Sequence, residues 1–393
     1  MLSHSMNKSV CVLPMVVLLC SAAQTDDITR LDGSKISKNE AATFARATLA
    51  REHVTGAEIA ILQHGRVVWN EAFGLRRRDP ELPMRTDTNT WAASFTKSVF
   101  ATYVMTLVEK GEFSLDTPVA RQLAQPLDQY ETYKETASEL VKDPRWTKVT
   151  PRMLLAHTSG LWNFATIEPD HKMRLHFEPG TQFWYSGEGL NVVQFVIEQQ
   201  QKKPLNELMQ DALFGPLGMK QTGMTYQAAW AENVADRYDE QEKFRSQTKR
   251  FPARASGNMA TSVDDMGRFL SALLDGKILR AATRKEMLKP YIQIRTLHEF
   301  PQKADEPDGE EARRVGLAYG LGWGLLTKTP YGPAFFKEGH GDGAQNYMIC
   351  FERSKDCMVI LTNSDNGEKA FKALLEKLMG DTVTPWEWEG YGH

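Results

Sequence analysis

Strand-forming segments lie near both ends of this chain, with a long helix-forming stretch between them. Residues 57–63 and 66–75 read as strands, and they flank His64-Gly65, which is a two-residue hairpin signal. Further segments that read as strands lie near the other end of the chain, at residues 322–328, 345–351 and 358–363. Strands from both ends are most simply joined in one antiparallel sheet. The middle of the chain must then leave that sheet and return to it, which restricts the fold more than any other feature.

The middle of the chain carries apolar residues at helical spacing. These segments are residues 97–110, 190–200, 204–213, 263–274 and 283–288. Two more helices are expected outside the middle, at residues 37–53 and 368–379. The predicted fold class is therefore α+β: an antiparallel sheet built from both termini and flanked by helices, with a mostly helical inserted domain.

The length fits a division into two domains. A chain of 393 residues has room for two units of roughly 150 residues. We expect residues 24–90 and 316–393 to form the sheet domain and residues 91–315 to form the helical domain. The polar segments 239–250 and 303–314 are expected to be long surface loops.

The first 23 residues resemble an export signal. Lys8 supplies a positive charge, residues 10–19 form an apolar run, and the small residues 21–23 offer a cleavage site. A membrane anchor fits less well, because about ten apolar residues are too few where spanning needs about 20. A lipid anchor on Cys20 also fits less well, because Leu19 before it is large. We therefore expect a secreted, periplasmic protein with no membrane span after cleavage.

Charge and motif content exclude several classes of function. With 47 basic and 50 acidic residues, the formal net charge is -3, which argues against nucleic-acid binding. The sequence holds no GxxxxGK[ST], HExxH, GxSxG or GxGxxG pattern. His171 and His176 lie five residues apart, which is not the i, i+4 spacing of a helical zinc pair. We expect neither metal nor cofactor, which leaves covalent catalysis by the chain's own side chains.

The pattern Ser-x-x-Lys could supply that chemistry, and it occurs three times. It begins at Ser5, Ser94 and Ser246. The first lies in the export segment and the third in a charged loop, whereas Ser94 opens an apolar helix. A lysine three residues later lies on the same helical face, so the Lys97 amine can reach the Ser94 hydroxyl. If burial lowers its pKa, that amine can act as the base for the serine. The alternative is a helix-capping serine followed by a surface lysine.

Six ordered segments strengthen the first interpretation. They are Ser94-Phe95-Thr96-Lys97, Leu154-Leu155-Ala156-His157-Thr158-Ser159-Gly160-Leu161, Pro179-Gly180-Thr181 leading to Tyr185-Ser186-Gly187, Pro216-Leu217-Gly218-Met219, Tyr319-Gly320-Leu321-Gly322-Trp323 and Gly339-His340-Gly341-Asp342-Gly343. In order and spacing they resemble the serine β-lactamase-related family, which includes class C β-lactamases, D-alanyl-D-alanine carboxypeptidases, D-aminopeptidases and family VIII carboxylesterases. The resemblance covers roughly residues 57–363.

The resemblance implies a role for each matching residue. Ser94 would be the acylated nucleophile, Lys97 its proton-shuttling partner, and Tyr185 the tyrosine that shares the proton with Lys97. His340 would take the place of the Lys or His of the third motif, on the strand that lines the pocket. The backbone amides of Ser94 and Gly343 would form the oxyanion hole. The substrate would be a small ester, amide or peptide.

Two departures from the family pattern bear on the substrate. Gly187 stands where many relatives carry an asparagine that would contact an acylamide, and Asp342 stands where a glycine is usual. If Asp342 points into the site, it disfavours anionic substrates. Both changes favour an esterase-like hydrolase. A β-lactamase or D-peptidase, and a catalytically silent peptidoglycan- or ligand-binding relative, remain alternatives.

Of the four cysteines, Cys11 and Cys20 lie in the export segment. Cys350 and Cys357 flank a polar turn between two strand-like runs. A hairpin around Arg353 places them opposite each other, which would fit a cross-strand disulfide in an oxidising compartment. Two reduced core cysteines are the alternative.

Overall fold

A computed structural model describes residues 26–300 and 308–391, together with Met1. The predicted export segment therefore lies, apart from Met1, outside the described residues. In the described part of the chain, no helix is both long and apolar enough to cross a membrane.

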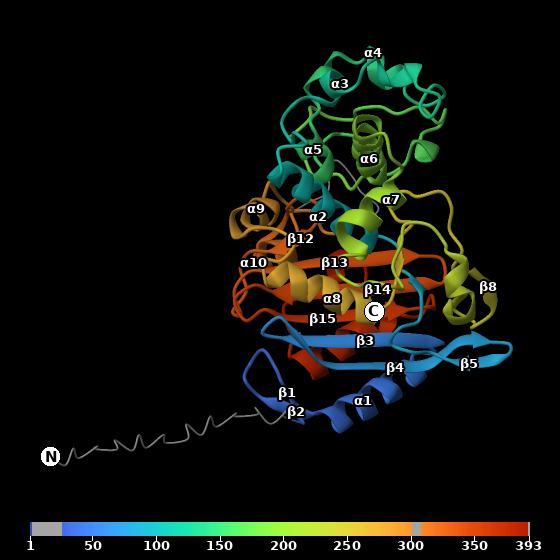
Figure 1. The fold of residues 1–393 in the computed structure, drawn as a ribbon, viewed down its shortest axis with the longest axis vertical. Helices are drawn as coiled ribbons and strands as arrows, with labels where there is room; N and C mark the ends of the chain where they lie inside the picture. Colours follow the sequence, from blue (N-terminus) through green and yellow to red (C-terminus); the bar gives the residue numbers. More distant parts are fainter. Residues whose placement is uncertain (2–25, 301–307, 392–393) are drawn as a thin grey trace.

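The centre of the fold is one antiparallel sheet that contains strands from both ends of the chain (Figure 1). Its order is β10-β11-β12-β13-β14-β15-β3-β4-β5. The early strands are β3 (Gly56–Gln63), β4 (Arg66–Arg78) and β5 (Glu81–Pro83). The late strands are β10 (Ile292–Gln293), β11 (Leu317–Tyr319), β12 (Gly324–Leu326), β13 (Ala334–Gly341), β14 (Ala344–Phe351) and β15 (Asp356–Thr362). The two sets meet where β15 pairs with β3, with Ala57 opposite Thr362. The predicted fold class is confirmed.

Each face of the sheet carries its own apolar core. Along β14, Tyr347, Ile349 and Phe351 belong to one buried cluster, and Met348 and Cys350 belong to the other. This alternation follows from the period of two in a strand, where successive side chains point to opposite faces. Because both faces are buried, the run from Tyr347 to Phe351 in β14 is apolar on both sides, and the polar residues before it, Gln345 and Asn346, are buried as well.

Helices from both ends of the chain cover the first of these faces. They are α1 (Lys38–Arg51) and α11 (Glu368–Leu374), and a π-helical turn extends α11 over Leu375–Met379. The helix α1 begins at Ser37, whose side chain accepts a hydrogen bond from the amide of Glu40, as a capping serine does. Two short strands, β1 (Asp27–Thr29) and β2 (Lys35–Ser37), precede it.

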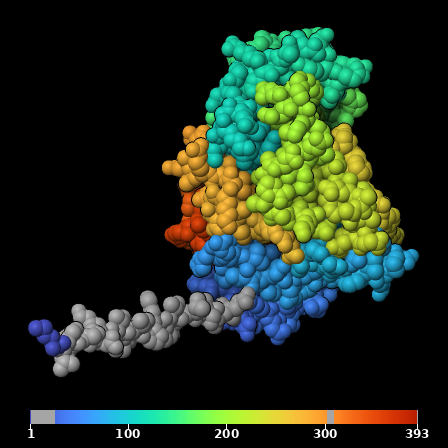
Figure 2. All heavy atoms as spheres, viewed as in Figure 1, coloured from blue at the N-terminus to red at the C-terminus, as the bar shows by residue number. Residues whose placement is uncertain are grey.

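Helices from the middle of the chain cover the other face. The helix α8 (Val263–Leu274) packs against β3, β4 and β15, and α2 (Phe95–Glu109) packs against β13. The other α-helices of the described residues are α3 (Val119–Gln122), α4 (Ser138–Lys142), α5 (Pro151–Leu155), α6 (Gly187–Gln201), α7 (Leu205–Met209), α9 (Ala281–Met287), α10 (Glu310–Val315) and α12 (Trp386–Glu389). Of these, α10 and α12 bury their apolar side chains on the first face. Segments from the first half of the insertion form the end of the molecule opposite β3 and β4 (Figure 2).

The segment predicted as a loop at residues 239–250 contains part of a small hairpin instead. Its strands are β7 (Asp236–Tyr238) and β8 (Phe244–Gln247), which pair with each other. The expectation of an irregular loop fails because its polar residues form cross-strand contacts, such as the guanidinium of Arg237 with the hydroxyl of Ser246. Another small pair, β6 (Thr90–Trp91) with β9 (Ala260–Thr261), fixes the chain just before Ser94.

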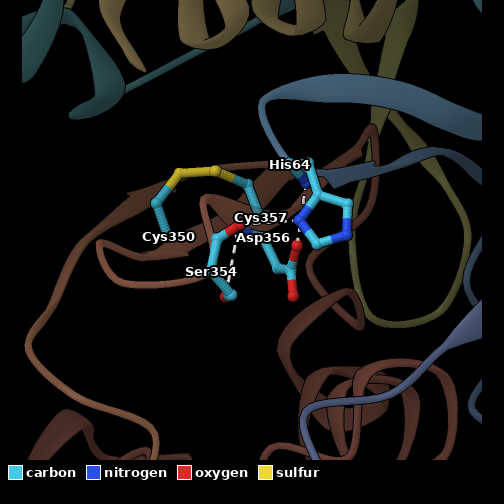
Figure 3. The surroundings of a disulfide bond; sticks show 5 residues. All are labelled: His64, Cys350, Ser354, Asp356 and Cys357. Carbon is cyan, nitrogen blue, oxygen red and sulfur yellow. Dashed lines mark hydrogen bonds between the residues drawn. A yellow bond between two sulfur atoms is a disulfide. The ribbon is translucent and has the colours of Figure 1, made fainter. Parts of the chain in front are cut away.

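The two cysteines outside the export segment form a disulfide (Figure 3). Cys350 on β14 lies directly opposite Cys357 on β15, as the predicted hairpin requires. Both residues are buried, and the turn between them is held by the amide of Asp356, which donates to the Ser354 hydroxyl. The structure thus has the cross-strand disulfide rather than two reduced thiols.

Removing this disulfide should destabilise the protein measurably. Closing so short a loop in the unfolded chain accounts for about 2–3 kcal/mol in the chain-entropy model. We expect the double variant Cys350→Ala, Cys357→Ala to unfold at lower denaturant concentration, with its activity retained. Unfolding monitored by tryptophan fluorescence measures this loss, and the wild type under reducing conditions is the matched comparison. Equal midpoints in all three samples would contradict the expectation.

Candidate active site

Ser94 stands at the N-terminus of α2, in a rigid setting. The preceding residue, Ala93, has a φ of 45°, a left-handed conformation that is uncommon for a residue other than glycine. Such strain persists only where the surroundings impose it, and it concentrates at functional sites. Here the β6–β9 pair and the hydrogen bond from Trp91 Nε1 to the Gly257 carbonyl hold the chain just before Ala93. Ser94 itself is partly exposed.

The amine of Lys97 lies within reach of the Ser94 hydroxyl. Its Nζ is 3.0 Å from Ser94 Oγ and 2.5 Å from the carbonyl oxygen of Ser256, and the side chain is buried. Burial and the nearby charge of Lys337 lower the pKa of Lys97 to about 7, although the charges of Glu338 and Glu299 act in the opposite direction. A large fraction of these amines is therefore unprotonated at neutral pH, as a general base must be.

Tyr185, which lies just before α6, places its phenol beside Lys97. Its ring centroid lies 4.8 Å from Lys97 Nζ, and its hydroxyl donates to Glu338 Oε1 at 3.2 Å. Burial, reinforced by the charge of Glu338, raises the pKa of Tyr185 well above its usual value, and a hydrogen bond with Ser94 partly opposes this rise. Of the two candidate bases, the Lys97 amine is the one that is unprotonated near neutral pH.

The ring of His157 packs against the ring of Tyr185. The two ring centroids lie 4.5 Å apart, and His157 Nδ1 accepts a hydrogen bond from the amide of Ser186 at 3.1 Å. Burial, with the charges of Lys97 and Lys337, holds the pKa of His157 well below its ordinary value. The imidazole is therefore neutral.

Three titratable residues beside this site were not predicted from the sequence. Lys337 and Glu338 lie on β13, and Glu299 follows β10. Lys337 Nζ lies 4.9 Å from the centre of the Tyr185 ring and donates to Glu338, and both side chains are buried. The triplet Lys337-Glu338-Gly339, which precedes the predicted His340, is a basic-x-glycine pattern. Lys337 and Glu338 could have been predicted as site residues from this pattern.

The three residues expected on the substrate side have other contacts. His340 Nδ1 lies 3.3 Å from Glu368 of α11, and the basic side chain of β13 that lies beside Tyr185 is that of Lys337. Lys337 and His340 are three residues apart in the strand, so their side chains leave it on opposite faces of the sheet. The amide of Gly343 donates to Asp365, and the Asp342 carbonyl accepts from Arg237.

The third residue of the tyrosine motif has no room for a side chain. A Cβ on Gly187 would lie 2.8 Å from the ring of Phe164 and 3.0 Å from Asn163 Oδ1. The Asn163 side chain accepts a hydrogen bond from the Gly187 amide. The loop at residues 163–164 therefore fills the space that an asparagine side chain would take at position 187.

The alternative Ser-x-x-Lys pair has a different geometry. Ser246 lies on β8, where its hydroxyl accepts from Arg237. Lys249 lies outside that strand, with its Nζ 5.3 Å from the centre of the Tyr226 ring. The first pair, at Ser5, lies outside the described residues. Of the two described pairs, the one at Ser94 combines a helix, burial and a direct contact between hydroxyl and amine.

The family model described as Beta-lactamase matches residues 41–378 of this chain. The chain belongs to the beta-lactamase family. This agrees with the resemblance that the six sequence segments carry. The nine-stranded sheet and the cluster of Ser94, Lys97 and Tyr185 lie within the matched residues.

The proteins to which this chain is similar carry names that describe different functions. Esterase EstB of Burkholderia gladioli is 30% identical over 49% of this chain and 53% of its own length. Penicillin-binding protein 4* of Bacillus subtilis is 22% identical over 84% of this chain and 72% of its own length. The chain spans about half to two thirds of the length of the first curated relatives that it matches.

Solved structures of this family share the fold. A penicillin-binding protein homologue from Pyrococcus abyssi superposes with a TM-score of 0.69 at 22% identity, covering 90% of this chain and 79% of that one. D-amino acid amidase from Ochrobactrum anthropi SV3 gives a TM-score of 0.64 at 23% identity, covering 86% and 95%. At these identities the likeness shows the fold alone. The family consists of serine hydrolases, and the chain's own residues must indicate the substrate.

Proposed function

We propose that this protein is a serine hydrolase that cleaves an ester or amide through a covalent acyl-enzyme on Ser94, with esterase-like preference. The observation that carries the proposal is the contact of 3.0 Å between Ser94 Oγ and the amine of Lys97, whose pKa is lowered to about 7. A serine hydroxyl is a poor nucleophile unless a nearby base can take its proton. The similarity to an enzyme named as an esterase supports the same conclusion.

The proposed reaction has two stages. Ser94 Oγ attacks the carbonyl carbon while its proton passes to Lys97 Nζ. The tetrahedral intermediate collapses as the proton passes, with the help of Tyr185, to the departing alcohol or amine. Water then attacks the acyl-enzyme while the same groups take a proton from it, and they deliver this proton to Ser94 Oγ as the acyl–oxygen bond breaks and the acid product leaves. The chain's own side chains supply every proton transfer.

We further propose that the amides of Ser94 and His340 stabilise the oxyanion. Asp342 and Gly343 form the two-residue turn between β13 and β14. The residues on either side of such a turn, here Gly341 and Ala344, hydrogen-bond to each other through their backbones. The amide of Gly341 then points to β14 and that of His340 to the opposite edge of β13. Pairing with β12 ends at Phe336, so that edge is open beside His340. The Gly343 amide, which already donates to Asp365, fits this role less well.

The proposal includes export, with residues 1–23 as a signal peptide. The sequence of that segment and the disulfide between Cys350 and Cys357 both support an oxidising compartment. A working β-lactamase or D-peptidase is the second candidate, supported by similarity to proteins named penicillin-binding proteins and D-amino acid amidase.

Labelling with a fluorophosphonate tests the central proposal. This reagent phosphonylates activated serines, so intact-mass spectrometry should show one adduct, and peptide mapping should assign it to Ser94. Turnover of 4-nitrophenyl esters, a chromogenic cephalosporin and a D-Ala-D-Ala peptide then separates the candidates. Absence of both the adduct and turnover would favour a catalytically silent relative.

Tyr185→Phe should lower kcat by about 10² to 10⁴, the usual range for a positioned acid-base group. The ring and its packing remain, but the hydroxyl that lies between Ser94 and Glu338 is lost. Steady-state kinetics with a 4-nitrophenyl ester measure the effect. A comparable control is Tyr347→Phe, which removes a buried hydroxyl bonded to Glu389 instead. A Tyr185→Phe variant with wild-type kcat would exclude the tyrosine from proton transfer.

A further inference from the structure

A buried ion pair lies beside the candidate nucleophile, and the reaction described above does not use it. Lys337 Nζ donates to Glu338 Oε1, and the exposed fractions of the two side chains are 0% and 7%. The same carboxylate oxygen accepts from the Tyr185 hydroxyl at 3.2 Å. Because Tyr185 also bonds with Ser94, this pair lies one residue away from the reacting hydroxyl.

The other titratable groups around Lys337 do not balance its charge. They come from several elements: Lys97 of α2, His157 after α5, Tyr185 before α6, Glu299 after β10, Tyr319 of β11 and Glu389 of α12. Burial raises the pKa of Glu389 well above its usual value, so its carboxyl is neutral. Burial and the charge of Glu338 raise the pKa of Glu299 to about 8, so its carboxyl is mostly protonated at neutral pH. The pKa of His157 is held well below its usual value, and those of both tyrosines are raised, so these three groups are neutral.

We propose that Glu338 determines which substrate charge this site accepts, by neutralising Lys337 and so selecting esters or amides that carry no carboxylate near the reacting carbonyl. This inference rests on the proposed function. An unpaired ammonium beside Ser94 would attract a substrate carboxylate. With Glu338 as its partner, Lys337 contributes no net charge.

The same reasoning predicts whether each variant binds carboxylate-bearing substrates better or worse than the wild type. Without the Glu338 charge, the site gains a net positive charge, and substrates with a carboxylate bind better. Without the Lys337 charge, the site gains a net negative charge, and the same substrates bind worse. Charges in a partly buried site are weakly screened, so a change of at least about tenfold in relative kcat/KM is expected.

Two esters with the same leaving group provide the measurement. 4-Nitrophenyl butyrate and 4-nitrophenyl hemisuccinate have acyl chains of similar length, and only the second ends in a carboxylate. The readout is the ratio of kcat/KM for hemisuccinate to that for butyrate. The ratio cancels any general loss of activity or of folded protein.

We expect Glu338→Gln to raise this ratio at least about tenfold and Lys337→Met to lower it by a similar factor. Glu58→Gln is the matched control, because Glu58 is also a buried carboxyl but is bonded to Thr90 and the amide of Val263. It should leave the ratio unchanged. If one variant does not fold, the other still tests the direction.

The outcomes separate the two levels of the proposal. If the wild type neither hydrolyses butyrate nor reacts with a fluorophosphonate, the proposed function fails, and the charge selection fails with it. If the wild type is active but the ratio stays within about twofold in both variants, the hydrolase stands and the role of Glu338 is overturned. A shift of the ratio in the same direction for both variants would also overturn it.

Discussion

Replacing Ser94 by alanine is expected to abolish both hydrolysis and fluorophosphonate labelling while the fold stays intact. The variant loses the atom that forms the acyl bond, and removal of a catalytic serine elsewhere costs on the order of 10⁶ in kcat. Stability should change little, because the Ser94 side chain makes no capping hydrogen bond to α2. Circular dichroism and thermal unfolding check the fold, and ester turnover checks the activity.

Ser246→Ala is the matched control for this experiment. It removes the serine of the other described Ser-x-x-Lys pair, whose hydroxyl contacts Arg237 on the neighbouring strand. Activity should stay within about twofold of the wild type. If labelling persisted in Ser94→Ala and disappeared in Ser246→Ala, the nucleophile would have to be reassigned to β8.

Lys97→Arg should be nearly as damaging as Lys97→Ala, with a loss of at least about a hundredfold in kcat. A guanidinium keeps its proton at any working pH, so it cannot act as a base even though it preserves the charge. It is also larger than the buried amine that it replaces. Retention of more than about a tenth of wild-type activity in Lys97→Arg would make the lysine an electrostatic partner and leave proton transfer to Tyr185.

The pH dependence of the wild type tests the same role independently. The unprotonated amine is the active form, so kcat/KM for a neutral ester should rise with pH and level off above the pKa of Lys97, which is about 7. A profile measured from pH 5 to 9 locates the midpoint. A midpoint above pH 9 would show that another group controls the proton transfer.

The parts of the fold that the sequence predicted correctly depend on local signals. The β3–β4 hairpin follows from His64-Gly65, and α1 follows from a capping serine before a run of helix-forming residues. By contrast, β13 was missed, because Lys337 and Glu338 interrupt its apolar pattern. They are tolerated inside the sheet because they pair with each other, which only the folded structure brings about.

The same distinction applies to the candidate site. Ser94 and Lys97 are three residues apart on one helix, so their contact could be expected from spacing alone. Tyr185 was found through the family resemblance, and its contact with Glu338 joins residues far apart in the chain. Lys337, whose side chain lies beside Tyr185, was not predicted, because the alternation of β13 could not be fixed before its partner strands were known.

The pairing of β15 with β3 has a consequence for how this protein must be made. Ala57 and Thr362 are about 300 residues apart in sequence, and contacts between such distant segments form slowly because a long loop must close first. A chain still on the ribosome has β3 and β4 but lacks the strand that covers the inner edge of β3. The central sheet, and with it the site at Ser94, can be completed only after β15 has been synthesised. Until then the apolar strands β3 and β4 stay without their partner, and unpaired apolar strands of this kind are prone to aggregation.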